Sequence, residues 1–139
     1  MSASRAWEAR LKLWHDAYRK SGRGLIIQTG APVRVGANGQ PCGWAGVGPP
    51  DFVGVVDGNA VFFDAKHTTA KGWAASKVPP HQWRDLDRAL AAGALTAIAL
   101  RCPSGMWWLP WGALRETRGA VDCVTVGRPI CPVQGWIDA

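Results

Sequence analysis

The sequence predicts an α/β fold in which helices flank a central mixed β-sheet, and three observations support this fold class. Helical and strand-like segments alternate along the chain, and a clearly marked β-hairpin occupies residues 51–66. A fully apolar run at residues 94–100 indicates a further strand directly after a predicted helix. With 139 residues, 47% of them hydrophobic, the chain has material for one core, so we expect a single domain spanning residues 1–139.

The N-terminal third is predicted to contain one helix and two short strands. Residues 4–21 form the helix, with Ser4 as its N-cap and a glycine just beyond its end. Short buried strands are predicted at residues 25–28 and 32–35, whereas residues 36–50 are turn-forming and poor in regular structure. The apolar residues of the helix recur at helical spacing and are Trp7, Leu11, Trp14 and Tyr18.

The segment after the hairpin is predicted to add one helix and two strands to the sheet. Residues 67–78 form a polar loop, and Pro79-Pro80 precede a helix that runs through Ala92 and is closed by Gly93. Residues 106–110 return as a strand after the apolar run. The rest holds at most one strand, at residues 122–126, and a loose tail.

The composition favours an intracellular protein that binds a polyanion. The net charge is +6 and the pI is near 9.6, with basic residues spread along the whole chain, which suits nucleic acid. No apolar run is long enough to span a membrane, and charges interrupt the N-terminal segment where a secretory signal would be apolar. We therefore expect a cytoplasmic location. The four cysteines are far apart, which favours reduced, buried thiols over a zinc site.

The predicted hairpin brings two aspartates together. Asp57-Gly58 is a preferred pair for a two-residue turn, and with such a turn Asp51 directly opposes Asp64. Because side chains alternate along a strand, Asp51, Asp64 and Lys66 share one face. Both faces are apolar in the middle of the hairpin, so we expect it to be central and buried.

Two opposed carboxylates repel each other, and partly buried charges cost several kcal/mol unless something pairs them. A divalent cation between the carboxylates would neutralise both, and oxygen ligands of this kind favour Mg²⁺ or Mn²⁺. Lys66 beside such an ion can orient or deprotonate an attacking water, or stabilise charge in the transition state of phosphodiester cleavage. On register alone, a structural ion pair at the mouth of the hairpin is an equally good interpretation.

The segment from Pro50-Asp51 to Asp64-Ala65-Lys66 resembles the PD-(D/E)xK nuclease signature. More narrowly, residues 49–69 followed by His81-Gln82 are similar to the RecU family of Holliday junction resolvases, and the similarity extends over about residues 5–110. The resemblance implies a restriction-endonuclease-like fold and a homodimeric, metal-dependent endonuclease that makes paired symmetric nicks in four-way DNA junctions during recombination and repair. The alternatives are a nuclease of the same superfamily acting on flaps, ends or duplex DNA, and a DNA-binding module that does not cut.

The resemblance also assigns roles to matching residues. Asp51 and Asp64 would be ligands of Mg²⁺, for which Mn²⁺ may substitute, with the Ala65 carbonyl as a further oxygen. Lys66 would be the catalytic base or stabiliser. Glu8 matches an N-terminal helical acid that binds metal, often through water; the alternative is an exposed glutamate beside Lys12.

Three residues around the second helix have open interpretations. Gln82 lies near the core-facing stripe of that helix and either contacts metal-bound water or phosphate or makes a helix-start hydrogen bond. His67 and His81 suit surface positions or phosphate contacts better than metal ligation.

The sequence departs from RecU proteins at two places. Position 64 is Asp where members usually have Glu, which the broader superfamily permits. RecU proteins carry a long stalk before the catalytic hairpin, whereas only residues 36–50, with Trp44 as their one aromatic residue, occupy that place here. The short segment bears on junction preference more than on nuclease chemistry, and so compact a chain suits a phage or prophage origin as well as a bacterial one.

Several basic and aromatic residues are candidates for contacts with DNA or with a second subunit. Trp73 would either stack on an unpaired base or pack in the core. The basic candidates, each of which is alternatively a solvated surface charge, are Arg34, Lys71, Lys77 and, along the first helix, Arg5, Arg10, Arg19 and Arg23. Dimer-interface candidates, with core packing as the alternative, are Trp107, Trp108 and Trp111.

Overall fold

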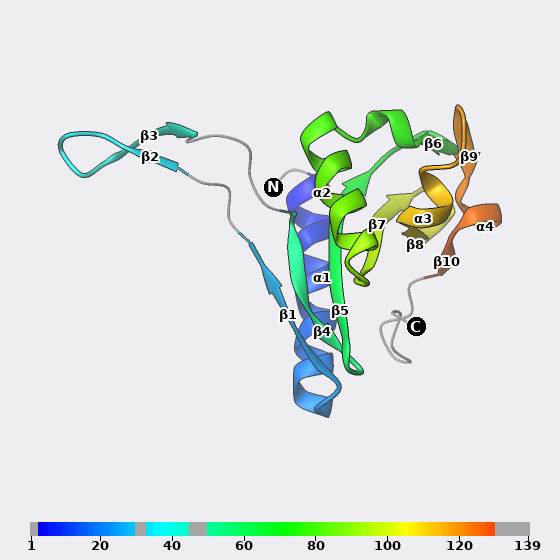
Figure 1. The fold of residues 1–139 in the computed structure, drawn as a ribbon, viewed down its shortest axis with the longest axis horizontal. Coiled ribbons are helices and arrows are strands. Elements are labelled where there is room, and N and C mark those ends of the chain that lie inside the picture. The colour runs from blue at the N-terminus through cyan, green and yellow to red at the C-terminus, as the bar shows by residue number, and fades with distance from the viewer. Residues whose placement is uncertain (1–2, 30–32, 45–49, 130–139) are drawn as a thin grey trace.

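The computed structural model describes residues 3–29, 33–44 and 50–129. Its main sheet has six strands in the order β1-β4-β5-β7-β8-β10 (Figure 1). Strands β5 and β7 run parallel, and the other neighbouring pairs are antiparallel. The strands are β1 (Gly24–Gln28), β4 (Phe52–Val56), β5 (Asn59–His67), β7 (Leu95–Cys102), β8 (Gly105–Pro110) and β10 (Arg128–Pro129). The predicted α/β fold with a mixed central sheet is therefore confirmed.

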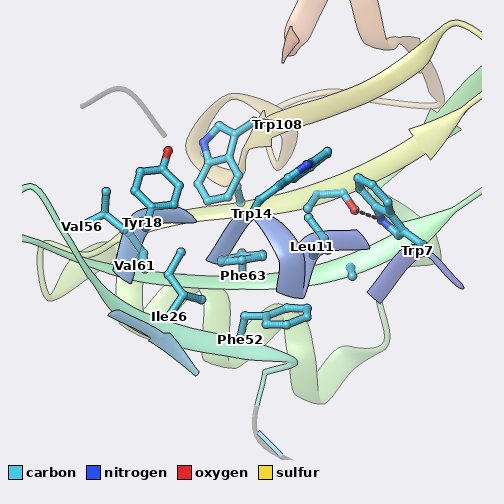
Figure 2. Close-up of a cluster of buried hydrophobic side chains, with 13 residues drawn as sticks. Trp7, Leu11, Trp14, Tyr18, Ile26, Phe52, Val56, Val61, Phe63 and Trp108 are labelled. Carbon is cyan, nitrogen blue, oxygen red and sulfur yellow. Dashed lines mark hydrogen bonds between the residues drawn. The ribbon is translucent and has the colours of Figure 1, made fainter. Parts of the chain in front are cut away.

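One face of the sheet is covered by helix α1 (Ala3–Ser21), whose apolar stripe builds the first core (Figure 2). Trp7 also donates a hydrogen bond from its indole Nε1 to the carbonyl oxygen of Ala99, at 3.0 Å, which fixes the helix against β7. The helix begins at Ala3, so the predicted cap Ser4 lies inside it, and it ends before Gly22, which has a φ of 74°. The buried residues of this core include Trp7, Leu11, Trp14, Tyr18, Phe52, Val56, Val61 and Phe63.

The other face is covered by α2 (Pro80–Ala91) and the short helix α3 (Trp111–Leu114), which form a second core over β7 and β8. Because parallel strands need a crossover connection, α2 serves as the link between β5 and β7. Trp108 is 5% exposed and Trp111 is fully buried. The prediction that Trp108 and Trp111 form a dimer interface is therefore wrong. The alternative, core packing, holds for both, because their side chains are buried within the chain. Trp107 is half-buried at the edge of the second core.

The register of the β4–β5 hairpin is the predicted one. Phe52 pairs with Phe63 and Val56 with Asn59. Asp57 and Gly58 both have positive φ, at 49° and 81°, as a type I′ turn requires.

The hairpin is less buried than predicted, and so is β1. The second core reaches β5 at Phe62 but leaves the outer face of β1 and β4 open. Val55 is 50% exposed as a result, and on β1 only Ile26 is buried, between exposed Leu25 and Ile27. Their apolar sequences resemble those of fully buried strands, but α2 and α3 pack on β5, β7 and β8 instead.

Several short elements were not predicted. Strand β3 (Pro41–Trp44) pairs with β2 (Val33–Val35), and Figure 1 shows this small hairpin standing apart from the main sheet. The predicted polar loop after the β4–β5 hairpin contains β6 (Gly72–Ala74), which pairs with β9 (Ala120–Asp122), and the 3₁₀ helix η1 (Ala75–Lys77). Only β2 was predicted as a strand; the other short segments carry no clear strand pattern of their own.

The strand predicted at residues 122–126 is wrong beyond Asp122. Residues Cys123–Val126 form helix α4, although their valines and threonine favour a strand. The Gly127 N–H donates to the Cys123 carbonyl oxygen at 2.7 Å, which closes a helical turn. The predicted loose tail from residue 130 onward lies outside the described residues.

Cys102 and Cys123 are buried free thiols, as expected, with sulfur atoms 3.7 Å apart. The Cys42 side chain and Cys131 lie outside the described part of the chain. Among the described residues, no helix is long and apolar enough to cross a membrane.

Candidate active site

The site forms at the mouth of the β4–β5 hairpin, where β5 continues beyond its partner. Strand β4 begins at Phe52, opposite Phe63, so the edge of β5 that would pair with β4 is open from Asp64 onward. The carboxylate of Asp51 fills this gap and accepts a hydrogen bond from the Ala65 N–H at 2.9 Å. In return, the Asp51 N–H donates to Oδ1 of Asp64 at 3.0 Å. These two bonds hold the carboxylates across the hairpin mouth, as the predicted register requires.

Asp64 is held in an environment that disfavours its charge. Its side chain is 1% exposed. Burial, together with the neighbouring charge of Asp51, raises the pKa of Asp64 to about 7, although the Asp51 N–H and the charge of Lys66 act in the opposite direction. A cation at the mouth of the hairpin would relieve this electrostatic cost.

A cavity of about 420 Å³ opens at this point. It brings together four of the predicted catalytic and metal-binding residues, which come from α1, the residue before β4, and β5. Asp64 does not line the cavity itself but accepts a hydrogen bond from the backbone N–H of Asp51, which does. The lining residues are Glu8, Asp51, Ala65, Lys66, His67, Trp73 and Lys77.

Glu8 is oriented by a residue that the sequence did not single out. Gln28, the last residue of β1, donates from Nε2 to Oε2 of Glu8 at 2.8 Å. Gln28 pairs with Phe52, next to Asp51, so the amide links the helix to the start of the hairpin. In the sequence, the only sign that Gln28 belongs to the site is that it is a polar residue at the end of a predicted strand.

Gln82 reaches the site through Lys66. The Lys66 Nζ donates to Oε1 of Gln82 at 2.8 Å. Helix α2 has Pro79 as its N-cap and no side-chain hydrogen bond at the cap. Gln82 therefore does not make the helix-start hydrogen bond that was the alternative interpretation. His81, its neighbour, is half-buried, and His67 is an exposed part of the cavity wall.

The donor set fits a hard divalent cation. The mouth offers the carboxylates of Asp51 and Asp64 and a backbone carbonyl at Ala65, which are oxygen ligands of the kind that Mg²⁺ and Mn²⁺ prefer. In the described ranges, no three His, Cys, Asp or Glu side chains gather closely enough to hold a metal by themselves. Water and substrate oxygens would therefore complete the coordination, as is usual for Mg²⁺.

The candidates for DNA contact have different outcomes. Lys77 is exposed and lines the cavity, and Lys71 is exposed just before β6. Trp73 is 2% exposed, so the prediction that it stacks on an unpaired base is wrong: β6–β9 pairing encloses its ring in the second core. The side chains of Arg34 and Arg5 lie outside the described part of the structure.

The arginines toward the end of α1 are engaged with carboxylates, whereas Arg10 is exposed. Arg19 pairs with Asp16 at 2.9 Å, and Arg23 pairs with Asp57 at 2.7 Å. Contacts of these two side chains with DNA would have to compete with those ion pairs.

The fold matches that of a solved structure, Hjc, a Holliday junction resolvase from the archaeal hyperthermophile Archaeoglobus fulgidus. The TM-score is 0.61 and the sequence identity is 19%, with 94% of this chain and 99% of the Hjc chain covered. No curated protein sequence matches the chain. The family model of recombination protein U, RecU, matches residues 47–116, which is half of the chain and includes the whole β4–β5 hairpin. The chain therefore belongs to the RecU family, as its sequence motifs predicted.

Proposed function

We propose that this chain is a metal-dependent Holliday junction resolvase, a crossover junction endodeoxyribonuclease acting in recombination and repair. The observation that carries the proposal is the opposition of half-buried Asp51 and buried Asp64, which are joined by two hydrogen bonds beside Lys66 in a chain of the RecU family. A fold does not assign a function by itself, but two opposed acids with an adjacent lysine are suited to phosphodiester hydrolysis. A bacterial cytoplasm, or the host cytoplasm of a phage, is the location that suits this substrate.

Asp51, Asp64 and the Ala65 carbonyl would hold the metal, which we propose to be Mg²⁺ with Mn²⁺ as a substitute. When bound, the ion supplies charge neutralisation at the phosphate and lowers the pKa of water. Glu8 borders the same cavity and would contribute through water, with Gln28 holding its carboxylate in place.

Lys66 acts on the attacking water or on the charge that develops at phosphorus. Its ammonium group is fixed by the 2.8 Å bond to Gln82, so it does not have to be ordered when substrate arrives. Gln82 is therefore a positioning residue that acts through Lys66. Lys77 and Lys71, together with Arg34, would supply contacts to phosphates, which position DNA without reading its sequence.

A dimer would match the two-fold symmetry of a four-way junction, since one chain has one hairpin and thus one site. With Trp108 and Trp111 buried, the exposed side chains Leu25, Ile27 and Val55 on the β1–β4 sheet edge are the better candidates for the interface. Light scattering should give about twice the chain mass for the wild type, and Ile27→Asp should lower it. A wild type that is monomeric at micromolar concentration would contradict the dimer.

The decisive test is a cleavage assay that compares four-way junctions, flaps and duplex DNA. The resolvase function predicts paired nicks at symmetric positions in the junction, with flaps and duplex cut much more slowly. Mg²⁺ or Mn²⁺ should support cleavage, whereas Ca²⁺ should support binding only, because its longer and looser coordination misplaces water and phosphate. Activity that survives excess EDTA would exclude the metal mechanism.

A second candidate is a nuclease of the same superfamily that acts on flaps, ends or duplex DNA. The observation that favours it is the shortness of the segment before the catalytic hairpin, where the described residues hold only β2 and β3, of three and four residues. Equal rates on junction and duplex would support this candidate.

A further inference from the structure

We propose that a second hollow, beside the catalytic cavity, binds a phosphodiester group that neighbours the scissile one on the same DNA strand. The proposal rests on the nuclease function proposed above. The hollow has a volume of about 430 Å³ and lies at the ends of β5 and β7. It is lined by His67, Thr68, Thr69, Arg101, Cys102 and Pro103.

The hollow adjoins the catalytic cavity, because His67 lines both. His67 is also the partner of Arg101 in the parallel pairing of β5 with β7. Paired residues on neighbouring strands present their side chains on the same face of the sheet. Because the two hollows share His67, a DNA strand with its scissile phosphate in the catalytic cavity would place a flanking phosphate in the second hollow, beside His67 and Arg101.

The lining of the hollow suits an anion that the protein binds directly. The Arg101 guanidinium can donate two parallel hydrogen bonds to phosphate oxygens, and the threonine hydroxyls and the His67 ring add further donors. No acidic side chain lines the hollow. The catalytic cavity differs, because it contains the carboxylates of Glu8 and Asp51 beside its two lysines, and a metal would offset those carboxylates when a phosphate approaches.

The hollow is ordered in advance by backbone bonds. The Thr68 N–H donates to the Arg101 carbonyl oxygen at 2.9 Å, which ties the segment after β5 to β7. The Ala70 N–H donates to the Thr68 Oγ1 at 3.1 Å, so the hydroxyl proton of Thr68 stays available as a donor. Preordered donors reduce the entropy that binding would otherwise lose.

Arg101 is also free to bind a ligand. It is exposed, whereas the five preceding residues of β7 are buried. Arg19, Arg23 and Arg115 each pair with a carboxylate, but among the residues that the structure describes Arg101 forms no ion pair. The buried neighbours of Arg101 stabilise β7, and the exposed Arg101 side chain is accessible to a phosphate.

The test is the salt dependence of binding to a four-way junction, measured with Ca²⁺ in place of Mg²⁺ so that DNA binds but is not cut. Arg101→Ala should weaken binding about fivefold or more and should reduce the slope of log K against log salt by about 0.9, the value for one lost phosphate contact. Arg101→Lys should keep the slope but lose part of the affinity, because lysine cannot form the paired bonds.

Two further variants separate a defined site from dispersed charge. Arg88→Ala removes the same charge from an exposed position in the last turn of α2 and should leave both affinity and slope unchanged within about twofold. Thr69→Val removes a hydroxyl and no charge, so it should weaken binding about two- to threefold without changing the slope.

Unchanged affinity and slope in Arg101→Ala, or an equal loss in Arg88→Ala, would overturn the proposed phosphate site. Failure of the nuclease function looks different: the wild-type chain would bind junctions and cut no DNA when Mg²⁺ is supplied. If the wild-type chain cuts DNA and Arg101→Ala binds junctions as tightly as the wild type, the phosphate site is refuted and the nuclease function is not.

Discussion

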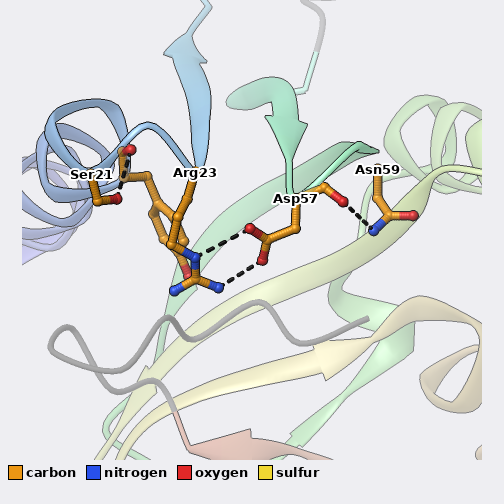
Figure 3. Close-up of polar contacts among 5 residues, drawn as sticks. Ser21, Arg23, Asp57 and Asn59 are labelled. Atoms are coloured by element: carbon orange, nitrogen blue, oxygen red, sulfur yellow. Dashed lines mark hydrogen bonds and ion pairs between the residues drawn. The ribbon is translucent and has the colours of Figure 1, made fainter.

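The two ends of the β4–β5 hairpin carry the same residue type in opposite electrostatic situations. At the tip, Asp57 is exposed and receives two hydrogen bonds from the Arg23 guanidinium, at 3.2 and 2.7 Å, which lower its pKa (Figure 3). At the mouth, Asp64 is buried beside Asp51 and its pKa is raised to about 7. At the tip, the neighbour of the aspartate is a cation of the protein, Arg23. At the mouth, the neighbour of Asp64 is a second carboxylate, Asp51. This contrast supports the proposal that the mouth of the hairpin binds an external cation.

The strongest test of this contrast is substitution at the mouth. Asp51→Asn, Asp64→Asn and Lys66→Ala should each reduce single-turnover cleavage at least a hundredfold, because they remove metal ligands or the charge that stabilises the transition state. Junction binding should stay largely intact, because affinity comes mainly from dispersed Arg and Lys. Near-normal cutting by any one of the three would refute the site assignment.

The Asp64→Asn variant adds a test of stability. In EDTA it should unfold at the same temperature as the wild type or higher, because it removes a buried charge next to Asp51. A clear loss of stability would show that the carboxylate serves the fold instead of the metal.

A smaller loss of cleavage is expected on substitution of Gln82, the hydrogen-bond partner of Lys66. Gln82→Ala should reduce cleavage about tenfold, because the ammonium group loses its 2.8 Å partner and its fixed position. Gln82→Glu keeps an oxygen acceptor and should recover much of the rate. Equal losses in both variants, with lowered melting temperatures, would mean that Gln82 supports only the helix.

Between the two ends, His15 of α1 gives the hairpin a pH-dependent stability. The ring lies against Phe52 and Phe63, with centroids 4.8 and 5.9 Å apart, and burial lowers its pKa to about 4 from 6.5. The folded state favours the neutral ring, so this contribution is complete above pH 6.5 and is lost as the pH falls toward 4. The free energy of unfolding should decrease by about 1.4 kcal/mol per pH unit within that window.

Urea denaturation of the wild type and of His15→Leu at several pH values measures this contribution. The difference between the two isolates His15 from Asp64, whose raised pKa acts in the opposite direction. Parallel pH profiles would contradict the assignment.

The smallest effect is expected at the tip. Asp57→Asn removes an exposed charge paired with Arg23, and exposed pairs add little to stability. Cleavage and melting temperature should both stay close to those of the wild type. Loss of cleavage in this variant would show that the two ends of the hairpin do not act independently.

The hairpin was predictable because its signals are local. A two-residue turn at Asp57-Gly58 determines the pairing of every residue outward, so the opposition of Asp51 and Asp64 followed from the sequence. The stripe of α1 and the two strands after α2 were predictable for the same reason, since each is a periodic or uniformly apolar run.

What the sequence did not reveal depends on contacts between distant segments. The bond from Gln28 to Glu8 joins α1 to the end of β1, and the bond from Lys66 to Gln82 joins β5 to α2. Trp73 is enclosed because β6 pairs with β9, about fifty residues later in the chain. Such pairings are set by the assembled tertiary structure, which neither periodicity nor turn chemistry encodes.

The hydrogen bond from Trp7 to the Ala99 carbonyl has a consequence for the order of folding in the cell. It joins residues 92 positions apart, so α1 cannot reach its final place until β7 has been synthesised. The hairpin with its two aspartates needs only a short loop and can form early, but Glu8 joins it only when the helix docks on the completed sheet. A chain still emerging from the ribosome would therefore carry the acid pair without its complete surroundings, and nuclease activity would begin only after most of the domain is translated.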